Sequence, residues 1–174
     1  MTENFTIEDA RAIAIGVHAN QTDKVGEPYM RHVESVAAGL ADFGSELEIA
    51  GMLHDVVEDS LEQTGRQITI DELRAQGVPE RSLQAIALVS NNLHPEGSSY
   101  EDMILRISDS PDATLVKISD NAHNSLAERV AKLGREVNPK YAAARRLLYP
   151  AASPEDTERI LRRVNPALLA ELAD

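Results

Sequence analysis

The chain has 174 residues and a formal net charge of −12, a size that suits one domain, residues 1–174, with a single hydrophobic core. It contains no cysteine, which excludes disulfides, thiolate zinc sites and iron–sulfur clusters, so any metal must be held by histidine, carboxylates or water. The acidic charge argues against a nucleic-acid partner, because such binding relies on a basic surface, but a small polyphosphate can still bind where a metal and a few cations reverse the local field.

The sequence carries no signal for export or membrane insertion. Residues 1–5 lack an apolar run, and no stretch approaches the roughly 20 apolar residues of a membrane span. We therefore expect a soluble, cytoplasmic protein without a membrane or nucleic-acid partner. The sequence does not indicate an oligomeric state.

Helix-start signals recur along the chain, whereas runs of alternating β-branched residues are scarce. Polar stretches at 20–27 and 91–99 predict loops. A capping box of Ser45 and Glu48 is expected to open a central helix, and a further helix is expected from Ser110 to Gly134. The expected helices begin at or beside Thr6, Pro28, Ser45, Thr69, Pro79, Ser99, Ser110, Asn138, Ser153 and Asn165. This pattern predicts an all-α, single-domain helical bundle of about eight to ten helices.

Residues 53–59, Leu-His-Asp-Val-Val-Glu-Asp, carry the densest group of chemically useful side chains. On a continuous helix at about 100° per residue, His54, Asp55, Glu58 and Asp59 share one arc, opposite an uninterrupted apolar stripe. A histidine and three carboxylates on a packed helix suit a divalent metal such as Mn, Fe, Zn or Mg. The same pattern also fits a solvated acidic face, and this stretch alone does not separate the two interpretations.

A second group of polar side chains lies on the helix expected after Ser110. Five of them share one face, opposite a face of apolar residues. The five are Lys117, Asp120, Asn121, Asn124 and Glu128. His123 falls on the packed side, so we interpret it as a buried histidine or one that supports a metal ligand, and not as a ligand itself.

His32 borders an apolar stripe, so taken alone it fits a structural histidine. The combination is more specific, because an ordered H…HD…ED…D set on helices resembles the HD superfamily of metal-dependent phosphohydrolases. The residues of that set are His32, His54-Asp55, Glu58-Asp59 and Asp120.

Within that superfamily the chain is most similar to the alarmone hydrolases. Residues 26–32 resemble their G-x-P-Y-x-x-H motif, residues 54–59 resemble H-D-x-x-E-D, and residues 116–124 resemble V-K-x-x-D-x-x-H-N. The likeness runs from about His18 to Asn124, and the total length suits a stand-alone hydrolase without a synthetase domain.

The resemblance implies an HD-type helical fold with one divalent ion, Mn²⁺ by likeness, although the ligand types also admit Fe²⁺ or Zn²⁺. The implied ligands are His32, His54, Asp55 and Asp120. Glu58 and Asp59 are then expected to act on the attacking water, which releases the 3′-pyrophosphate from guanosine 3′,5′-bis(diphosphate) or a related nucleotide polyphosphate. Lys24 and Lys117 are expected to meet phosphate oxygens, and Asn124 to hydrogen-bond sugar or phosphate.

Two residues depart from the family pattern. The family usually has an arginine-lysine pair before the glycine, whereas this chain has Asp23-Lys24, and Ser60 stands where threonine is usual. An acid at position 23 removes a guanidinium that packs against the purine base, so the preferred base is left open. Two alternatives remain: an HD nucleotidase that releases orthophosphate from another nucleotide, and a catalytically idle nucleotide-binding HD domain.

Overall fold

The computed structural model describes residues 4–132 and 139–172. Within these residues there are eleven α-helices, four 3₁₀-helices and no strand, with one isolated bridge between Thr22 and Pro28. The all-α prediction is therefore confirmed. None of the helices in this part of the chain is both long enough and apolar enough to cross a membrane.

The α-helices follow one another with short connections, and their bounds are as follows. They are α1 (Ile7–His18), α2 (Met30–Gly39), α3 (Ser45–Leu53), α4 (Val56–Thr64), α5 (Ile70–Ala75), α6 (Glu80–Val89), α7 (Tyr100–Ser108), α8 (Pro111–Asn124), α9 (Ala127–Lys132), α10 (Pro139–Leu148) and α11 (Pro154–Val164). The 3₁₀-helices are η1 (Ala41–Phe43), η2 (Asn91–Leu93), η3 (Tyr149–Ala151) and η4 (Pro166–Leu172).

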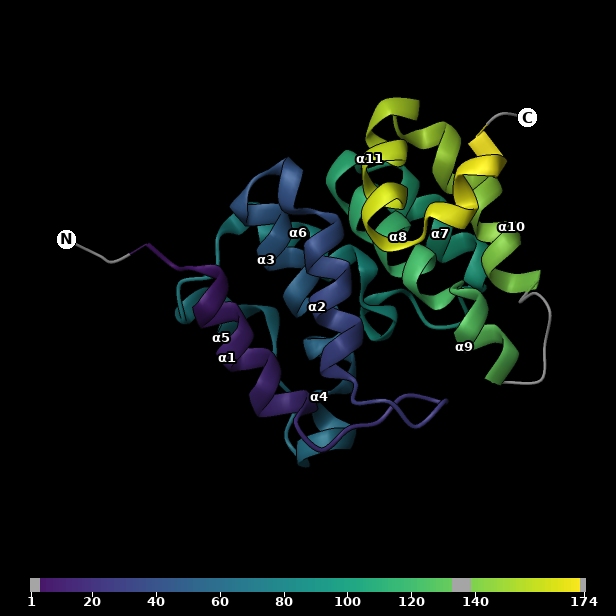
Figure 1. Ribbon diagram of the computed structural model, residues 1–174. Coiled ribbons are helices and arrows are strands. Elements are labelled where there is room, and N and C mark those ends of the chain that lie inside the picture. The colour runs from purple at the N-terminus through teal and green to yellow at the C-terminus, as the bar shows by residue number, and fades with distance from the viewer. Residues whose placement is uncertain (1–3, 133–138, 173–174) are drawn as a thin grey trace.

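Helix α8 lies at the centre of the bundle. It contacts α2, α3, α6, α7, α10 and α11, and every residue from 113 to 123 is buried. In Figure 1, α1 lies on one side of the bundle and the C-terminal helices α10 and α11 lie on the other. A functional side chain on α8 is therefore held by packing on all sides.

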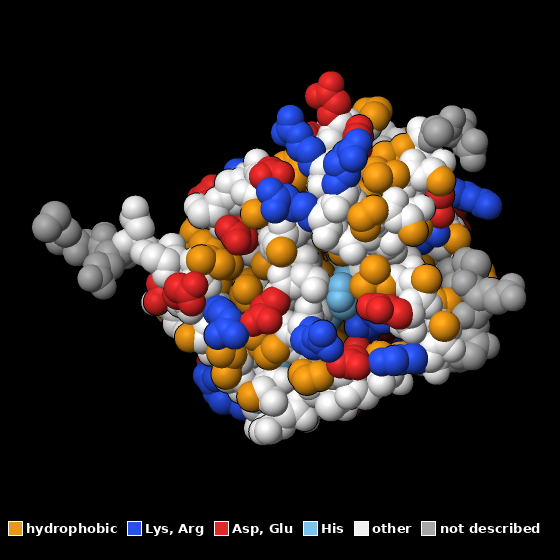
Figure 2. Space-filling view, in the orientation of Figure 1, with side chains coloured by type: hydrophobic (Ala, Val, Ile, Leu, Met, Phe, Trp, Pro, Cys, Tyr) orange, Lys and Arg blue, Asp and Glu red, His pale blue; other side chains and the backbone are white. Residues whose placement is uncertain are grey.

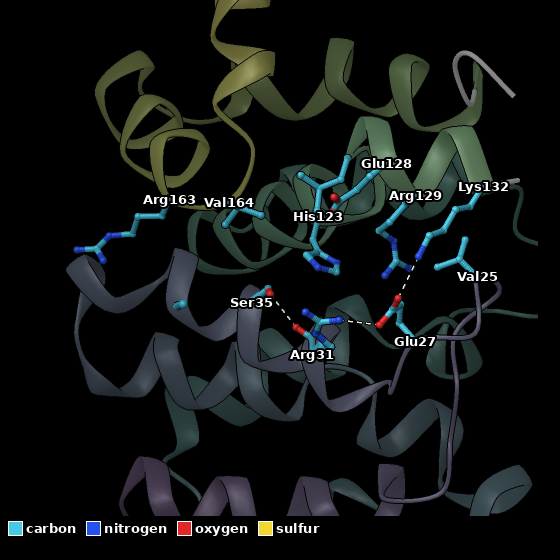
Figure 3. Close-up of a pocket in the computed structure, with 12 residues that line it drawn as sticks. Val25, Glu27, Arg31, Ser35, His123, Glu128, Arg129, Lys132, Arg163 and Val164 are labelled. Carbon is cyan, nitrogen blue, oxygen red and sulfur yellow. Dashed lines mark hydrogen bonds and ion pairs between the residues drawn. The ribbon is translucent and has the colours of Figure 1, made fainter.

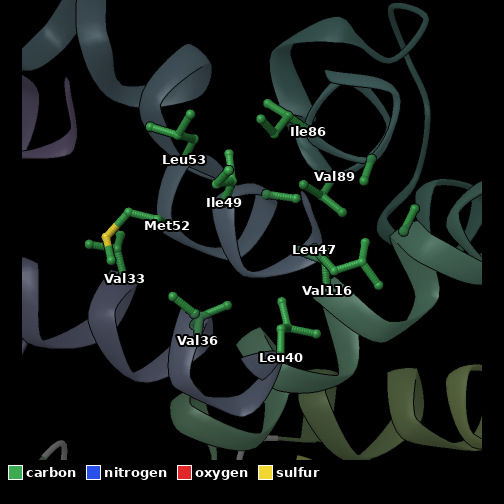
Figure 4. Close-up of a cluster of buried hydrophobic side chains, with 14 of the residues drawn as sticks. Val33, Val36, Leu40, Leu47, Ile49, Met52, Leu53, Ile86, Val89 and Val116 are labelled. Carbon is green, nitrogen blue, oxygen red and sulfur yellow. The ribbon is translucent and has the colours of Figure 1, made fainter. Parts of the chain in front are cut away.

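The main hydrophobic core joins α2, α3, α6 and α8. Figure 4 shows aliphatic side chains from these helices pointing toward one another, among them Val36, Ile49, Ile86 and Val116, each of which is less than 2% exposed. Because such a core tolerates little displacement, it fixes how the four helices lie relative to one another.

Two glycines allow the helices around the site to approach closely. A Cβ atom on Gly51 of α3 would lie 2.9 Å from the Cα of Ala37 in α2 and 2.7 Å from Leu40 Cδ1. A Cβ atom on Gly39 of α2 would clash with Ser119 of α8. Glycine at both positions therefore sets the spacing of α2 against α3 and α8.

Two helices that were expected to be continuous are broken. The central helix ends at Leu53 and restarts as α4 at Val56, and the helix from Ser110 ends at Asn124 and is followed by α9. The expected end at Gly134 and the start at Asn138 lie outside the described residues. These two breaks, with a 3₁₀-helix where a helix was expected at residue 166, explain why eleven α-helices stand in place of eight to ten.

Helix starts follow the capping signals, with two corrections. Thr6, Thr69 and Ser99 form capping boxes, because each hydroxyl accepts from a backbone N–H three residues on. The box expected at Ser45 is wrong, since Gly44 precedes α3 and no side chain caps it. Helix α2 begins at Met30, two residues after Pro28, because Pro28 is engaged in the bridge with Thr22.

Candidate metal centre

Four side chains from three parts of the bundle converge on one buried point: His32 of α2, His54 and Asp55 between α3 and α4, and Asp120 of α8. Oδ1 of Asp120 lies 3.2 Å from Nε2 of His32 and 3.8 Å from Nε2 of His54. Oδ2 of Asp55 lies 3.6 Å and 2.9 Å from the same two nitrogens. Ligand atoms of His32, His54 and Asp120 all lie within 4.8 Å of one another, so this trio could hold a metal ion, with Asp55 beside it.

The break between α3 and α4 lets two consecutive residues face the same point. His54 still has helical backbone angles, but Asp55 has φ −100° and ψ −4°, and α4 starts from its carbonyl, which accepts from Asp59 N at 2.9 Å. The expectation that residues 53–59 form a continuous helix is therefore wrong. On such a helix adjacent side chains diverge by about 100°, whereas here the two side chains meet at 2.9 Å.

Hydrogen bonds at the rear of both imidazoles leave their Nε2 atoms facing the cluster. Nδ1 of His54 donates to the carbonyl of Gly51 at 2.7 Å, so in the neutral ring, the form that binds a metal, the lone pair is on Nε2. That Nε2 is buried and makes no hydrogen bond within the described residues, although Asp55 Oδ2 is close. A buried, unpaired ring nitrogen beside carboxylates fits a bound cation.

His123 supports His32 in the same way. The two Nδ1 atoms lie 2.8 Å apart, so one must donate to the other. Burial, then the neighbouring His32, lower the pKa of His123 to about 3, so it is neutral and its Nδ1 accepts from His32. The interpretation of His123 as a buried histidine that supports a ligand agrees with this contact.

The carboxylates favour positive charge at the centre. Burial lowers the pKa of His54, but Asp55 and then Asp120 more than offset it and raise that pKa to about 9. Burial likewise opposes ionisation of Asp120, yet Lys117 and the two histidines hold the pKa of its carboxyl well below its usual value. Burial also opposes ionisation of Asp55, yet His54 and His32 hold the pKa of its carboxyl well below its usual value, so both acids carry charge at neutral pH and attract a cation.

Neighbouring side chains fix the carboxylates. The hydroxyl of Tyr29 donates to Asp55 Oδ2 at 2.6 Å. Lys117 Nζ donates to Asp120 Oδ2 at 2.7 Å, and Asn124 Nδ2 donates to Asp120 Oδ1 at 2.6 Å. These bonds hold the acids in a defined orientation, which metal sites require of their ligands.

A cavity of about 480 Å³, which we call the main cavity, opens over the centre. Its wall includes the five residues expected to act on the attacking water or to contact the substrate. These are Lys24, Glu58, Asp59, Lys117 and Asn124.

Glu58 and Asp59 differ in their surroundings. Glu58 is held on the wall by Asn91, whose backbone N and side-chain Nδ2 each donate to it at 2.9 Å. Asp59 accepts from Gln21 Nε2 at 2.8 Å. Burial raises the pKa of Asp59 to about 6, despite the Gln21 bond. Without an ion present, Asp59 can therefore gain and lose a proton near neutral pH.

No protein-family model matches the chain. It is 29% identical over 149 residues to the guanosine-3′,5′-bis(diphosphate) 3′-pyrophosphohydrolase of Aquifex aeolicus, covering 78% of this chain and 20% of that protein. It is 30% identical over 142 residues to the GTP pyrophosphokinase of Streptomyces coelicolor, covering 78% and 16%. It is 26% identical over 125 residues to the bifunctional (p)ppGpp synthase/hydrolase SpoT of Escherichia coli, covering 68% and 17%.

The fold is that of a solved structure, a metazoan ortholog of SpoT described as hydrolysing ppGpp. The TM-score is 0.61 over 99% of this chain and 94% of that one, at 17% sequence identity. The chain is similar to the alarmone hydrolases in sequence and in fold. It spans about a fifth or less of the length of the curated relatives named above.

Two polar residues expected on the site face lie elsewhere. Asn121 is buried away from the cavity, where it donates to the carbonyl of Tyr141 at 3.1 Å and accepts from Arg145 at 3.2 Å. Glu128 is exposed and lines a different cavity, because the break before α9 redirects the chain. The face shared by five residues on a continuous helix is therefore reduced to three.

Several residues of the centre lack a recognisable sequence signal. Nδ1 of His18 bonds Gln21 Oε1 at 2.6 Å, so these two residues carry a hydrogen-bonded chain to Asp59. Tyr100 and Lys140 also line the cavity, and Lys140 Nζ lies 4.1 Å from the centre of the Tyr100 ring. They come from α7 and α10, outside the motifs shared with the alarmone hydrolases, so only the tertiary structure brings them to the site.

The departure at Asp23 has a structural counterpart. Arg129 of α9 donates to Asp23 Oδ2 at 2.6 Å, and both residues line the main cavity. A guanidinium therefore lies beside the position at which this chain lacks an arginine. Position 23 itself carries no guanidinium, as the sequence shows, and the sequence did not indicate that Arg129 of α9 would lie beside it.

Proposed function

We propose that this chain is a Mn²⁺-dependent hydrolase that removes the 3′-pyrophosphate from guanosine 3′,5′-bis(diphosphate)-type alarmones. The observation that carries the proposal is the buried cluster of His32, His54, Asp55 and Asp120 beneath a cavity whose wall also includes Glu58, Asp59 and three lysines. The similarity to alarmone hydrolases supports the choice of substrate.

Each proposed ligand offers one atom toward the same point. These atoms are the Nε2 nitrogens of His32 and His54 and the carboxylate oxygens of Asp55 and Asp120. A divalent ion bound there would supply a Lewis acid that lowers the pKa of water and polarises a phosphate oxygen. The nitrogen and oxygen ligand set admits Mn²⁺, Fe²⁺ and Zn²⁺, and we favour Mn²⁺ by likeness to the family.

The acids on the cavity wall orient the attacking water and accept its proton. Water adds to the phosphorus attached to the 3′-oxygen, the bond from that phosphorus to the 3′-oxygen breaks, and pyrophosphate and a 3′-hydroxyl result. Asp59, held by Gln21, accepts the proton from the water, and Glu58, held by Asn91, orients it. The proton is then available for the 3′-oxygen that leaves.

Cations on the cavity wall receive the phosphate groups. Lys24 and Lys117 line the cavity, and Lys117 also holds Asp120 through its Nζ. Asn124 bonds the same carboxylate, so a substrate that contacts Lys117 or Asn124 contacts the residues that orient a metal ligand. We further propose that the partner is a small nucleotide polyphosphate and not a nucleic acid, and that the enzyme acts in the cytoplasm.

One assay tests the proposal against its alternatives. The chain is reconstituted with Mn²⁺, Fe²⁺ or Zn²⁺ in turn, then incubated with guanosine 3′,5′-bis(diphosphate) and a panel of nucleoside mono- and polyphosphates, and the released group is identified. We expect pyrophosphate and guanosine 5′-diphosphate, with the highest turnover in Mn²⁺. Release of orthophosphate from another nucleotide would make it a nucleotidase, and binding without turnover would make it a nucleotide-binding domain.

A further inference from the structure

Asp23 is a buried acid that organises one end of the main cavity. Its side chain is 3% exposed, and Oδ1 accepts from the backbone N–H groups of Val25 and Glu27 at 2.9 and 3.0 Å. Burial alone would raise its pKa, but the backbone N–H groups of Glu27 and Val25, and then Arg129, lower the pKa below its usual value. Asp23 is therefore a fixed negative charge whose second oxygen is available to Arg129.

Arg129 is held in place by that charge across 106 residues of sequence. Its side chain is 16% exposed, which is low for an arginine, and what remains accessible faces two cavities, the main one and a neighbouring one of about 380 Å³. Within the described residues, Nη1 is the one side-chain nitrogen of Arg129 that forms a hydrogen bond. That bond uses one edge of the planar guanidinium. The flat face is not used by that bond.

Figure 3 shows the location of Arg129 from the neighbouring cavity. Its side chain descends from α9 between His123 and Val25, toward the loop that carries Glu27. Glu27 is bonded on this side by Arg31 and Lys132, at 2.6 and 3.0 Å. Figure 2, in the orientation of Figure 1, shows a histidine surface in a hollow bordered by acidic and basic side chains. Arg129 thus forms part of the partition between the two cavities.

Two of the three tyrosines that line the main cavity, Tyr29 and Tyr100, are already engaged. The Tyr29 ring packs against His18 and His32, with ring centres 5.1 and 5.3 Å apart, and its hydroxyl is bonded to Asp55. The Tyr100 ring lies under the Lys140 ammonium. Tyr141 is farther from that ammonium, at 5.9 Å, and is the alternative platform. Arg129 offers a planar surface that is fixed by an ion pair.

We infer that Arg129, positioned by Asp23, is the platform on which the base of the bound nucleotide stacks. A guanidinium stacks well on aromatic rings, and the Asp23 carboxylate balances its charge, so the pair suits an uncharged base better than a phosphate group. The phosphates are left to the lysines of the cavity. The inference rests on the proposed function only in taking the ligand to be a nucleotide.

Equilibrium binding tests this without turnover. The full chain loaded with Mn²⁺ is titrated calorimetrically with guanosine 5′-diphosphate, which lacks a 3′-pyrophosphate, and with inorganic pyrophosphate, which lacks a base. Arg129→Lys retains the charge and the partner of Asp23 but loses the plane. We expect this variant to bind guanosine 5′-diphosphate about fivefold to tenfold more weakly than the wild type does, and to bind pyrophosphate with an affinity within about twofold of the wild type.

Two further variants separate stacking from a general structural role. Asp23→Asn keeps an oxygen for Val25 and Glu27 but removes the charge that holds Arg129, and we expect the same selective loss. Lys132→Gln removes a cation from the same helix, outside the main cavity, and is expected to change the affinity for neither ligand. The thermal midpoint of each variant is measured to show that it is folded.

Three results would overturn the inference. The first is a wild type that binds the two ligands equally, and the second is equal weakening of both ligands in Arg129→Lys. The third is an Arg129→Lys variant that binds both ligands as the wild type does, together with a Tyr141→Leu variant that selectively loses affinity for guanosine 5′-diphosphate. Failure of the wild type to hydrolyse guanosine 3′,5′-bis(diphosphate) would contradict the proposed function and leave these binding results standing, so the two failures are distinguishable.

Discussion

Replacing Gly51 with alanine should damage the metal centre from a distance. The added methyl would lie 2.9 Å from the Cα of Ala37, whereas ordinary contact begins at 3.4 Å, so α2 and α3 must separate by about half an ångström. The obstacle is backbone, which cannot rotate away. His32 lies on α2 and His54 follows α3, so the same movement separates two proposed ligands.

The magnitude follows from two opposing effects. Alanine is favoured over glycine within a helix by about 1 kcal/mol, but overpacking of a filled core costs about 1–3 kcal/mol. We expect a net loss of about 1–2 kcal/mol in the free energy of unfolding. Metal ligands must lie within about 0.2 Å of their preferred distances, so the affinity for Mn²⁺ should fall about tenfold or more.

Gly16→Ala is the matched control. Gly16 lies in α1, and a methyl group there has no atom within 4 Å, so we expect a stabilisation of about 0.5–1 kcal/mol and unchanged metal affinity. Urea unfolding of the metal-free proteins and calorimetric titration with Mn²⁺ measure both quantities. A Gly51→Ala variant as stable as the wild type, with unchanged Mn²⁺ affinity, would refute the reasoning that glycine sets this helix spacing.

Three further predictions concern the site and its support. His54→Ala should abolish stoichiometric metal binding, measured by elemental analysis after dialysis, and retention of the metal would show that the ligand set is wrong. Asp59→Asn should abolish turnover with metal content unchanged. In the metal-free protein, the same substitution should also raise the free energy of unfolding by about 1 kcal/mol at pH 7 and leave it unchanged at pH 4. The reason is that ionising Asp59 disfavours the folded state as the pH rises from the usual pKa of 3.8 toward about 6. A uniform effect of Asp59→Asn on urea unfolding across that range would contradict the role of burial. Arg145→Met should cost about 2–3 kcal/mol, since it strips partners from buried polar groups, whereas Arg146→Met on the exposed face of α10 should change unfolding by less than about 0.5 kcal/mol.

Much of the fold and of the centre could be predicted because short-range signals determine it. Capping hydroxyls such as Thr69 and Ser99 locate helix starts, since the cap is a bond between residues three apart. The proposed ligands were recognisable because each lies in a motif, and the structure brings all four together.

What the sequence could not predict depends on contacts between distant residues. Arg145 looks like an ordinary basic residue on a helix, but it is 5% exposed and bonds Asn121 and Ser125 where α8 ends, so it helps to fix a break that periodicity alone does not indicate. The Asp23–Arg129 pair is equally invisible, because an acid at position 23 gains its meaning only from a cation on α9.

The turn at residues 54–55 has a consequence for anyone who builds or searches for such centres. A histidine-aspartate dipeptide grafted into the middle of an unbroken helix would direct its two side chains to different flanks, and no single ion could reach both. A useful scaffold must therefore end one helix and begin another between the two residues, as this chain does between Leu53 and Val56. The dipeptide is informative only together with the bend that accompanies it.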